Sequence, residues 1–151
     1  MVKAFDIHDN KFFIIGIAIV ILDQITKYFA KQLTESIVII PRIFSLTLVK
    51  NEGIAFGMLQ GFISIPVWAS IMAIGFSLYY YNRLNNLGAI SLGLIFGGTI
   101  GNLIDRMLLG AVIDFFNFHI WPVFNIADIA LTIGSILLII SIWKFEKEEI
   151  I

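Results

Sequence analysis

The sequence predicts an all-α integral membrane protein with four transmembrane helices and a small β element in its first outer-side loop. Its 151 residues are 59% hydrophobic and only 14% charged, whereas soluble domains are about 45–50% apolar and about 25% charged. Four apolar runs approach the roughly 20 residues that a helix needs to cross a bilayer. One connecting loop alternates apolar and polar residues, a pattern typical of strands. We therefore expect residues 1–151 to form a single membrane-embedded domain.

The four apolar runs define the expected transmembrane helices. They cover residues 12–30, 62–81, 87–104 and 126–143. A cleavable signal peptide is the alternative for the first run, but no small-x-small cleavage pattern follows it. The second run ends in Tyr79, Tyr80 and Tyr81, aromatic residues typical of a membrane interface. These features favour an uncleaved bundle with two longer loops on one side.

The first of these loops carries the β-like segment, residues 36–58. Its first half is dense in β-branched residues, and Leu46 and Leu48 alternate with Ser45 and Thr47. Alternation with a period of two predicts short strands. We expect these strands to lie at the membrane surface.

Composition also excludes several classes of function. The net charge of -1 offers no basic face for nucleic acid, and the absence of Cys removes disulfides, thiolate catalysis and Cys-bound zinc. His8 and His119 are the only histidines, too few and too far apart for a typical metal centre. We expect no metal and no cofactor. The ten Lys and Arg residues divide equally between the two predicted sides, so their placement does not orient the chain.

Asp114 and Asp128 bracket an apolar and aromatic stretch, VIDFFNFHIWPVFNIAD over residues 112–128. Burying a carboxylate without a partner costs several kcal/mol or more, so both acids need an explanation. Asn125 and Asp128 have the spacing of a helix N-cap and its third residue, which explains Asp128 alone. Two carboxylates in contact cannot both ionise easily, and such a pair can activate water for peptide hydrolysis.

Other polar residues interrupt the predicted spans. Asp23 and Lys27 are four residues apart and can pair on one helix face; the alternative to a functional role is an ion pair at the membrane edge, with Lys27 snorkelling. Asn102, Asp105 and Arg106 form a polar cluster at the end of the third span. The alternative for this cluster is a local cap of the helix end.

Two other classes of function fit the same composition. A small proton-coupled transporter would also bury acids such as Asp23 and Asp128 among its helices, although it should place them near the middle of the membrane. A non-catalytic membrane subunit is the third possibility. Gly93, Gly97 and Gly101 in the third span have the four-residue spacing that lets helices approach closely, which is primarily a structural signal.

Five segments, in order and spread over essentially the whole chain, carry a resemblance to a known family. They are DQITK at 23–27, NEGIAFG at 51–57, GGTIGNLIDR at 97–106, VIDF at 112–115 and WPVFNIAD at 121–128. In these segments the chain resembles bacterial lipoprotein signal peptidase (signal peptidase II).

The resemblance implies an aspartic endopeptidase of the bacterial inner membrane, with both termini cytoplasmic and the active site facing the outer side. Its substrate would be a diacylglyceryl-modified prolipoprotein, cut before the lipidated Cys. Its partners would be this substrate and the lipid bilayer, and we expect it to act as a monomer.

The resemblance also assigns roles to individual positions. The catalytic pair would be Asp114 and Asp128. Support of the active site would come from Asn102, Arg106, Asn125 and Asp105. Substrate contact or structural support would come from Asp23, Lys27, Asn51 and Gly53. No role is carried over to His119, and the apolar residues near it are expected to form a lid over the site: Phe115, Phe116, Phe118, Ile120 and Trp121.

Overall fold

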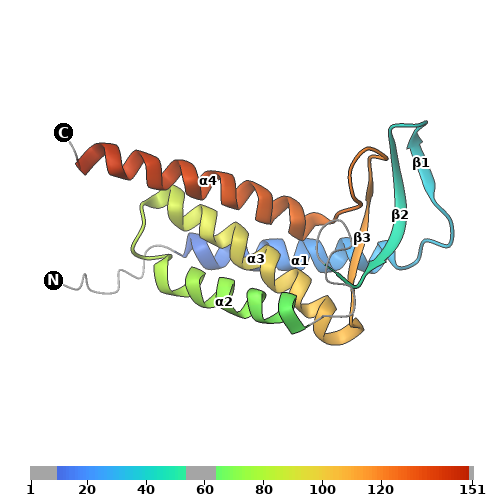
Figure 1. Ribbon diagram of the computed structural model, residues 1–151, viewed down its shortest axis with the longest axis horizontal. Coiled ribbons are helices and arrows are strands. Elements are labelled where there is room, and N and C mark those ends of the chain that lie inside the picture. Colours follow the sequence, from blue (N-terminus) through green and yellow to red (C-terminus); the bar gives the residue numbers. More distant parts are fainter. Residues whose placement is uncertain (1–9, 54–63, 150–151) are drawn as a thin grey trace.

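The computed structural model describes residues 10–53 and 64–149, and in these residues four helices stand on a three-stranded sheet (Figure 1). The helices are α1 (Lys11–Ala30), α2 (Ser64–Tyr80), α3 (Asn86–Leu109) and α4 (Ile126–Glu149). The strands are β1 (Ile37–Ile40), β2 (Phe44–Asn51) and β3 (Val112–Asn117).

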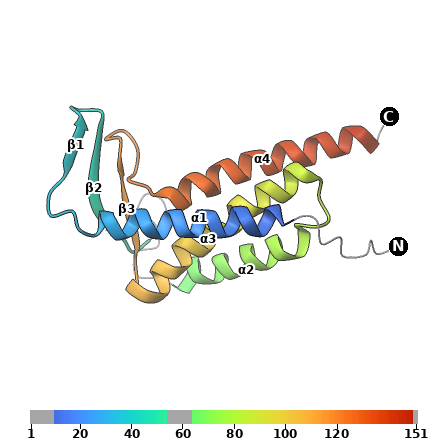
Figure 2. The ribbon, with the colours of Figure 1, turned by 180° about the vertical axis from the view of Figure 1, so that it is seen from behind.

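The helices run alongside one another, and the sheet lies across one end of the bundle. The view from behind shows that α1 begins and α4 ends at the end opposite the sheet (Figure 2). Both long connections, from α1 to α2 and from α3 to α4, are therefore on the side of the sheet. The predicted arrangement of two longer loops on one side is present in the structure.

Three helices are long and apolar enough to cross a membrane: α1, α3 and the part of α4 from Ile126 to Trp143. The first and last agree closely with the expected spans 12–30 and 126–143. Helix α2 is apolar but has 17 residues in the structure, and the first two residues of the expected span 62–81 lie outside the described residues. A crossing by α2, and thus the count of four spans, stays a prediction.

Helix α3 is longer than the expected span 87–104. It continues to Leu109 and ends at Gly110, whose φ of 72° is left-handed and whose N–H bonds the carbonyl of Arg106 at 3.1 Å. Glycine adopts this conformation without a steric penalty and commonly closes helices. Asn102 and Asp105 are consequently inside the last turns of α3, not at its end.

The sheet corrects the expectation that the β element belongs to the first loop alone. Its order is β1-β2-β3, with antiparallel pairing throughout, so the second loop supplies one edge strand. Alternate residues of a strand face opposite sides, and Ile113 and Phe115 of β3 pack on Ala30 at the end of α1. Asp114, between them, faces the other side. Residues 54–58 of the predicted β-like segment lie outside the described residues.

Helix α3 is the centre of the bundle and contacts α1, α2 and α4. Glycines let its backbone approach those of α1 and α4: a Cβ on Gly97 would lie 2.6 Å from the Gly16 carbonyl oxygen of α1, and one on Gly98 would lie 2.5 Å from the Ala127 carbonyl oxygen of α4. The structural interpretation of the glycine spacing is confirmed. Helix α2 packs mainly against α3, which leaves room for a pocket between α2 and α4.

Candidate active site

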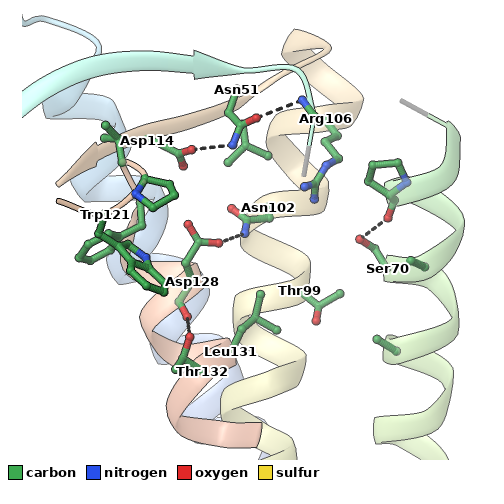
Figure 3. Close-up of a pocket in the computed structure, with 18 residues that line it drawn as sticks. Asn51, Ser70, Thr99, Asn102, Arg106, Asp114, Trp121, Asp128, Leu131 and Thr132 are labelled. Atoms are coloured by element: carbon green, nitrogen blue, oxygen red, sulfur yellow. Dashed lines mark hydrogen bonds between the residues drawn. The ribbon is translucent and has the colours of Figure 1, made fainter. Parts of the chain in front are cut away.

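A pocket of about 440 Å³ lies where α2, α3 and α4 meet the sheet (Figure 3). Its wall includes six of the ten predicted site residues: Gly53 and the five polar residues Asn51, Asn102, Arg106, Asp114 and Asp128. The five polar residues come from two strands and two helices, and they are up to 77 positions apart in the sequence (51 to 128). Both carboxylates point into this space.

Asp114 is carried by β3 and is 2% exposed. The side-chain amide of Asn51 donates to its Oδ2 at 3.0 Å, and that of Asn125 donates to its Oδ1 at 2.7 Å. Burial raises the pKa of Asp114 to about 7, and the negative charge of Asp128 acts in the same direction. The two amides lower the pKa but do not cancel the effect of burial. Asp114 is therefore a carboxyl group that can hold a proton near neutral pH.

Asp128 lies in the first turn of α4 and forms a reciprocal cap with Asn125. The Asn125 N–H donates to Asp128 Oδ2 at 3.1 Å, and the Asp128 N–H donates to Asn125 Oδ1 at 2.9 Å. The predicted helix start is confirmed. The other carboxylate oxygen accepts from the Asn102 amide at 2.9 Å. Asp128 is half-buried and still lines the pocket, so capping the helix leaves it accessible to a reactant.

Two asparagine amides connect the acids. Asn125 Nδ2 donates to Asp114 Oδ1 and also to Asn102 Oδ1, at 2.7 and 3.0 Å. Asn102 then donates to Asp128. This chain of hydrogen bonds holds the carboxyl groups of β3 and α4 in one arrangement without placing a positive charge in contact with either.

A buried ionic cluster lies next to the pocket. Lys27 Nζ is 2.8 Å from Asp23 Oδ2 and 3.0 Å from Asp105 Oδ2, and it donates to Asn102 Oδ1 at 2.9 Å. The Lys27 side chain is 1% exposed. The predicted pairing of Asp23 with Lys27 is therefore confirmed, but the expectation that Lys27 snorkels is wrong, because its side chain is buried and α3 supplies it with further partners.

The remaining residues named from the sequence differ in whether they line the pocket. Gly53 is buried, and its N–H donates to Asn51 Oδ1 at 3.0 Å. His119 lies away from the pocket and contacts Ser45 of β2, with 3.3 Å between Nε2 and Oγ. The expected lid is wrong for Phe115 and stays a prediction for the other four residues. Trp121 lines the pocket, but Phe115 belongs to the hydrophobic core because β3 turns it toward α1.

Several polar residues of the site did not stand out in the sequence. Gln24 donates to Asp23 at 3.2 Å and to Asp105 at 3.3 Å, and its place directly after Asp23 was the available signal. Ser70 of α2 lines the pocket, as an isolated polar residue in an apolar helix. Within residues 10–53 and 64–149, no group of three His, Cys, Asp or Glu side chains is placed to hold a metal ion.

The structure defines a class of protein: an apolar helical bundle with an end pocket lined by two carboxyl groups and an arginine, groups of the kind that acid–base catalysis uses. Comparison with known sequences gives the particular family. A sequence model described as Signal peptidase (SPase) II matches residues 15–144. The chain belongs to this family and is a peptidase of bacterial membranes.

Individual relatives agree over nearly their full length. The lipoprotein signal peptidase of Halothermothrix orenii is 42% identical, over 89% of this chain and 97% of its own. That of Pseudomonas putida is 38% identical, over 89% and 88% of the two chains. A solved structure described as a bacterial membrane enzyme superposes with a TM-score of 0.84 at 34% identity, covering 91% of this chain and 90% of its own.

Proposed function

We propose that the protein is an aspartic endopeptidase that removes signal peptides from diacylglyceryl-modified prolipoproteins, cutting before the lipidated Cys. Family membership supports the substrate class. One observation carries the mechanism: the carboxyl groups of Asp114 and Asp128, here called the dyad, come from different elements and point into one pocket.

The environments of the two acids support different roles for them. Asp128 accepts hydrogen bonds at both oxygens from Asn102 and Asn125, so neighbouring donors hold its carboxylate in the geometry of an acceptor. Asp114 is the more buried acid, and its raised pKa favours the protonated form. Asp128 would take a proton from a bound water while Asp114 donates one to the carbonyl oxygen of the scissile bond. A tetrahedral intermediate then forms without a covalent bond to the enzyme.

The pocket wall supplies further groups for a peptide substrate. Arg106 lines the pocket near the dyad, and its guanidinium has several N–H donors for substrate carbonyl groups. Apolar residues such as Trp121 and Leu131 line the same space, which suits the lipid chains and apolar signal peptide of the substrate. Water can reach a site at this end of the bundle without crossing the hydrocarbon core.

We also infer the orientation in the membrane. Helix α1 begins and α4 ends at the end opposite the pocket, which is consistent with cytoplasmic termini and an active site on the outer side of the inner membrane. A single domain acting as a monomer is the simplest form of this proposal.

The transporter alternative receives less support from the geometry. It needs Asp23 and Asp128 to exchange protons along one path. Asp23 is instead enclosed, with Lys27 at 2.8 Å and the Ala127 N–H at 3.0 Å from its carboxylate oxygens. Both oxygens of Asp23 thus have partners within the bundle, and neither lines the pocket.

The test is cleavage of a diacylglyceryl-modified prolipoprotein by purified protein, followed by the gel shift of the released lipoprotein. Asp114→Asn and Asp128→Asn should each lower turnover by at least about a thousandfold, since both proton-transfer groups are needed in the same step. Glu35→Gln, an exposed acid outside the pocket, is the matched control and should cleave normally. Near-normal turnover by either dyad variant would refute the mechanism, as would inhibition by a chelator that added metal reverses.

A further inference from the structure

The buried cluster of Lys27, Asp23 and Asp105 touches the backbone and the amides that hold the dyad. We propose that Lys27 is a positioning residue, which through this cluster holds both acids of the dyad in their reactive arrangement. The inference rests on the proposed function, because it takes Asp114 and Asp128 as the reacting groups.

Each carboxylate of the cluster binds the backbone immediately before one acid of the dyad. Asp105 Oδ2 accepts from the N–H of Ile113 at 3.0 Å, one residue before the first acid. Asp23 Oδ1 accepts from the N–H of Ala127 at 3.0 Å, one residue before the second. Lys27 Nζ contacts the other carboxylate oxygen of Asp23, Oδ2, at 2.8 Å. It contacts the same Oδ2 of Asp105 at 3.0 Å. One ammonium group therefore ties the start of β3 to the start of α4.

Lys27 also determines which way the Asn102 amide faces. Asn102 Oδ1 accepts from Lys27 Nζ at 2.9 Å and from Asn125 Nδ2 at 3.0 Å. An ammonium group can only donate hydrogen bonds, so the oxygen of this amide must face the lysine. The amide nitrogen is then turned toward Asp128, to which it donates at 2.9 Å. Lys27 thereby helps to keep the Asn102 amide N–H directed at the Asp128 carboxylate, which accepts it.

The charge of Lys27 reaches the dyad as well. Its positive charge lowers the pKa of Asp114, against the larger effects of burial and of Asp128. In the described part of the chain, β2 and α2 bring only neutral groups to the pocket wall. The charged groups near the dyad are those of α1 and α3, namely Lys27, Asp23, Asp105 and Arg106.

The first test compares Lys27→Met with Lys31→Met by the pH dependence of turnover. Lys31 is one turn further along the chain and exposed, so it is a matched control and should leave the profile unchanged. Lys27→Met should lower turnover by about tenfold or more. It should also move the limbs of the pH profile upward by about one unit, since loss of a nearby positive charge favours protonated carboxyl groups.

A second variant separates positioning from folding. Lys27→Met combined with Asp23→Asn removes one positive and one negative charge, so the cluster keeps its original net charge. It also keeps an oxygen at position 23 to accept from Ala127. This variant should fold, and the limbs of its profile should return toward those of the native protein, while turnover stays low because Asn102 has lost its lysine donor.

Native turnover by the folded double variant would overturn the inference. Failure of both variants to fold would also overturn it, because the lysine would then be needed for the fold itself. Asp114→Asn and Asp128→Asn are measured alongside. If these two are inactive while the Lys27 variants are normal, only the positioning role fails. If either dyad variant is active, the proposed function fails first.

Discussion

Two pairs of acids lie near each other in the described part of this protein, and only one of them faces a pocket. Asp23 and Asp105 share the ammonium group of Lys27 and bind backbone N–H groups, so their oxygens are committed. Among residues 10–53 and 64–149, the donors to Asp114 and Asp128 are neutral side-chain amides and one backbone N–H, and both acids face a pocket.

The difference lies in the partners, since the residue type is the same. A carboxylate in contact with a lysine is stabilised in its charged form, which suits a structural role. A buried carboxyl group that neutral amides hold keeps a pKa near the working pH, which suits proton transfer. Burial alone therefore does not identify a reactive acid.

The largest expected effect is on the pH dependence of stability. The folded-state pKa of Asp114 is raised from 3.8 to about 7, so the unfolded chain gives up this proton at lower pH than the folded protein does. Stability should fall as the pH rises from about 4 to about 7, by up to about 4 kcal/mol, and then level off. In Asp114→Asn this decline should be absent. Thermal unfolding in detergent, followed by tryptophan fluorescence, measures both; parallel pH profiles would contradict the raised pKa.

The second prediction gives an acid of the dyad a lysine partner, as Asp23 and Asp105 have in Lys27. Asn51→Lys places an ammonium group where an amide now donates to Asp114 at 3.0 Å. The positive charge should stabilise the ionised form of Asp114 and lower turnover about a hundredfold relative to Asn51→Met, which loses the same hydrogen bond without adding charge. Equal turnover by the two variants would show that neutral surroundings are not what distinguishes the dyad.

The third prediction disturbs the cluster through its closest backbone neighbour. A Cβ on Gly101 would lie 2.5 Å from Asp23 Oδ2, so Gly101→Ala should cost about 2 kcal/mol of unfolding free energy. Gly75 of α2 has nothing within 4 Å of its would-be Cβ. Gly75→Ala is the matched control and should be neutral or slightly stabilising. A Gly101→Ala protein as stable as the control would mean that the cluster can shift freely.

The smallest effect is expected at the edge of the pocket. The Thr132 hydroxyl donates to the backbone carbonyl of Asp128 at 2.8 Å and makes no bond to its carboxylate. Thr132→Val keeps the shape of the side chain and should change turnover by less than about threefold. A loss of tenfold or more would place this hydroxyl among the groups that act on the substrate.

Much of the fold was predictable because it depends on local properties of the chain. Apolar runs of the right length predicted α1, α3 and α4, and the Asn125 and Asp128 spacing predicted the start of α4. Strand β3 was missed because its residues are buried on both faces at their first four positions, so the polar alternation that identifies a surface strand is absent. Helix α3 extends beyond the apolar run that predicted it, because it ends only where Gly110 adopts the left-handed conformation.

The candidate site was predictable as a set of residues but not as an arrangement. The motif segments named all ten positions, yet the sequence favoured neither a surface ion pair nor a buried cluster for Lys27. Only the packing of α1 against α3, through Gly97 and Gly101, puts this lysine out of contact with water. Similarly, Phe115 belongs to the core and Trp121 to the pocket because β3 fixes the direction of each side chain in this segment.

The sequence by itself determined that the chain is a membrane protein, where its helices lie and which family it belongs to, because composition, hydrophobic length and short motifs are properties of the chain alone. Tertiary structure decided which acids meet a lysine and which meet a pocket. That choice depends on contacts between residues such as Asn51 and Asp114, which are 63 positions apart. The electrostatic environment that separates a structural carboxylate from a reactive one exists only once these contacts have formed.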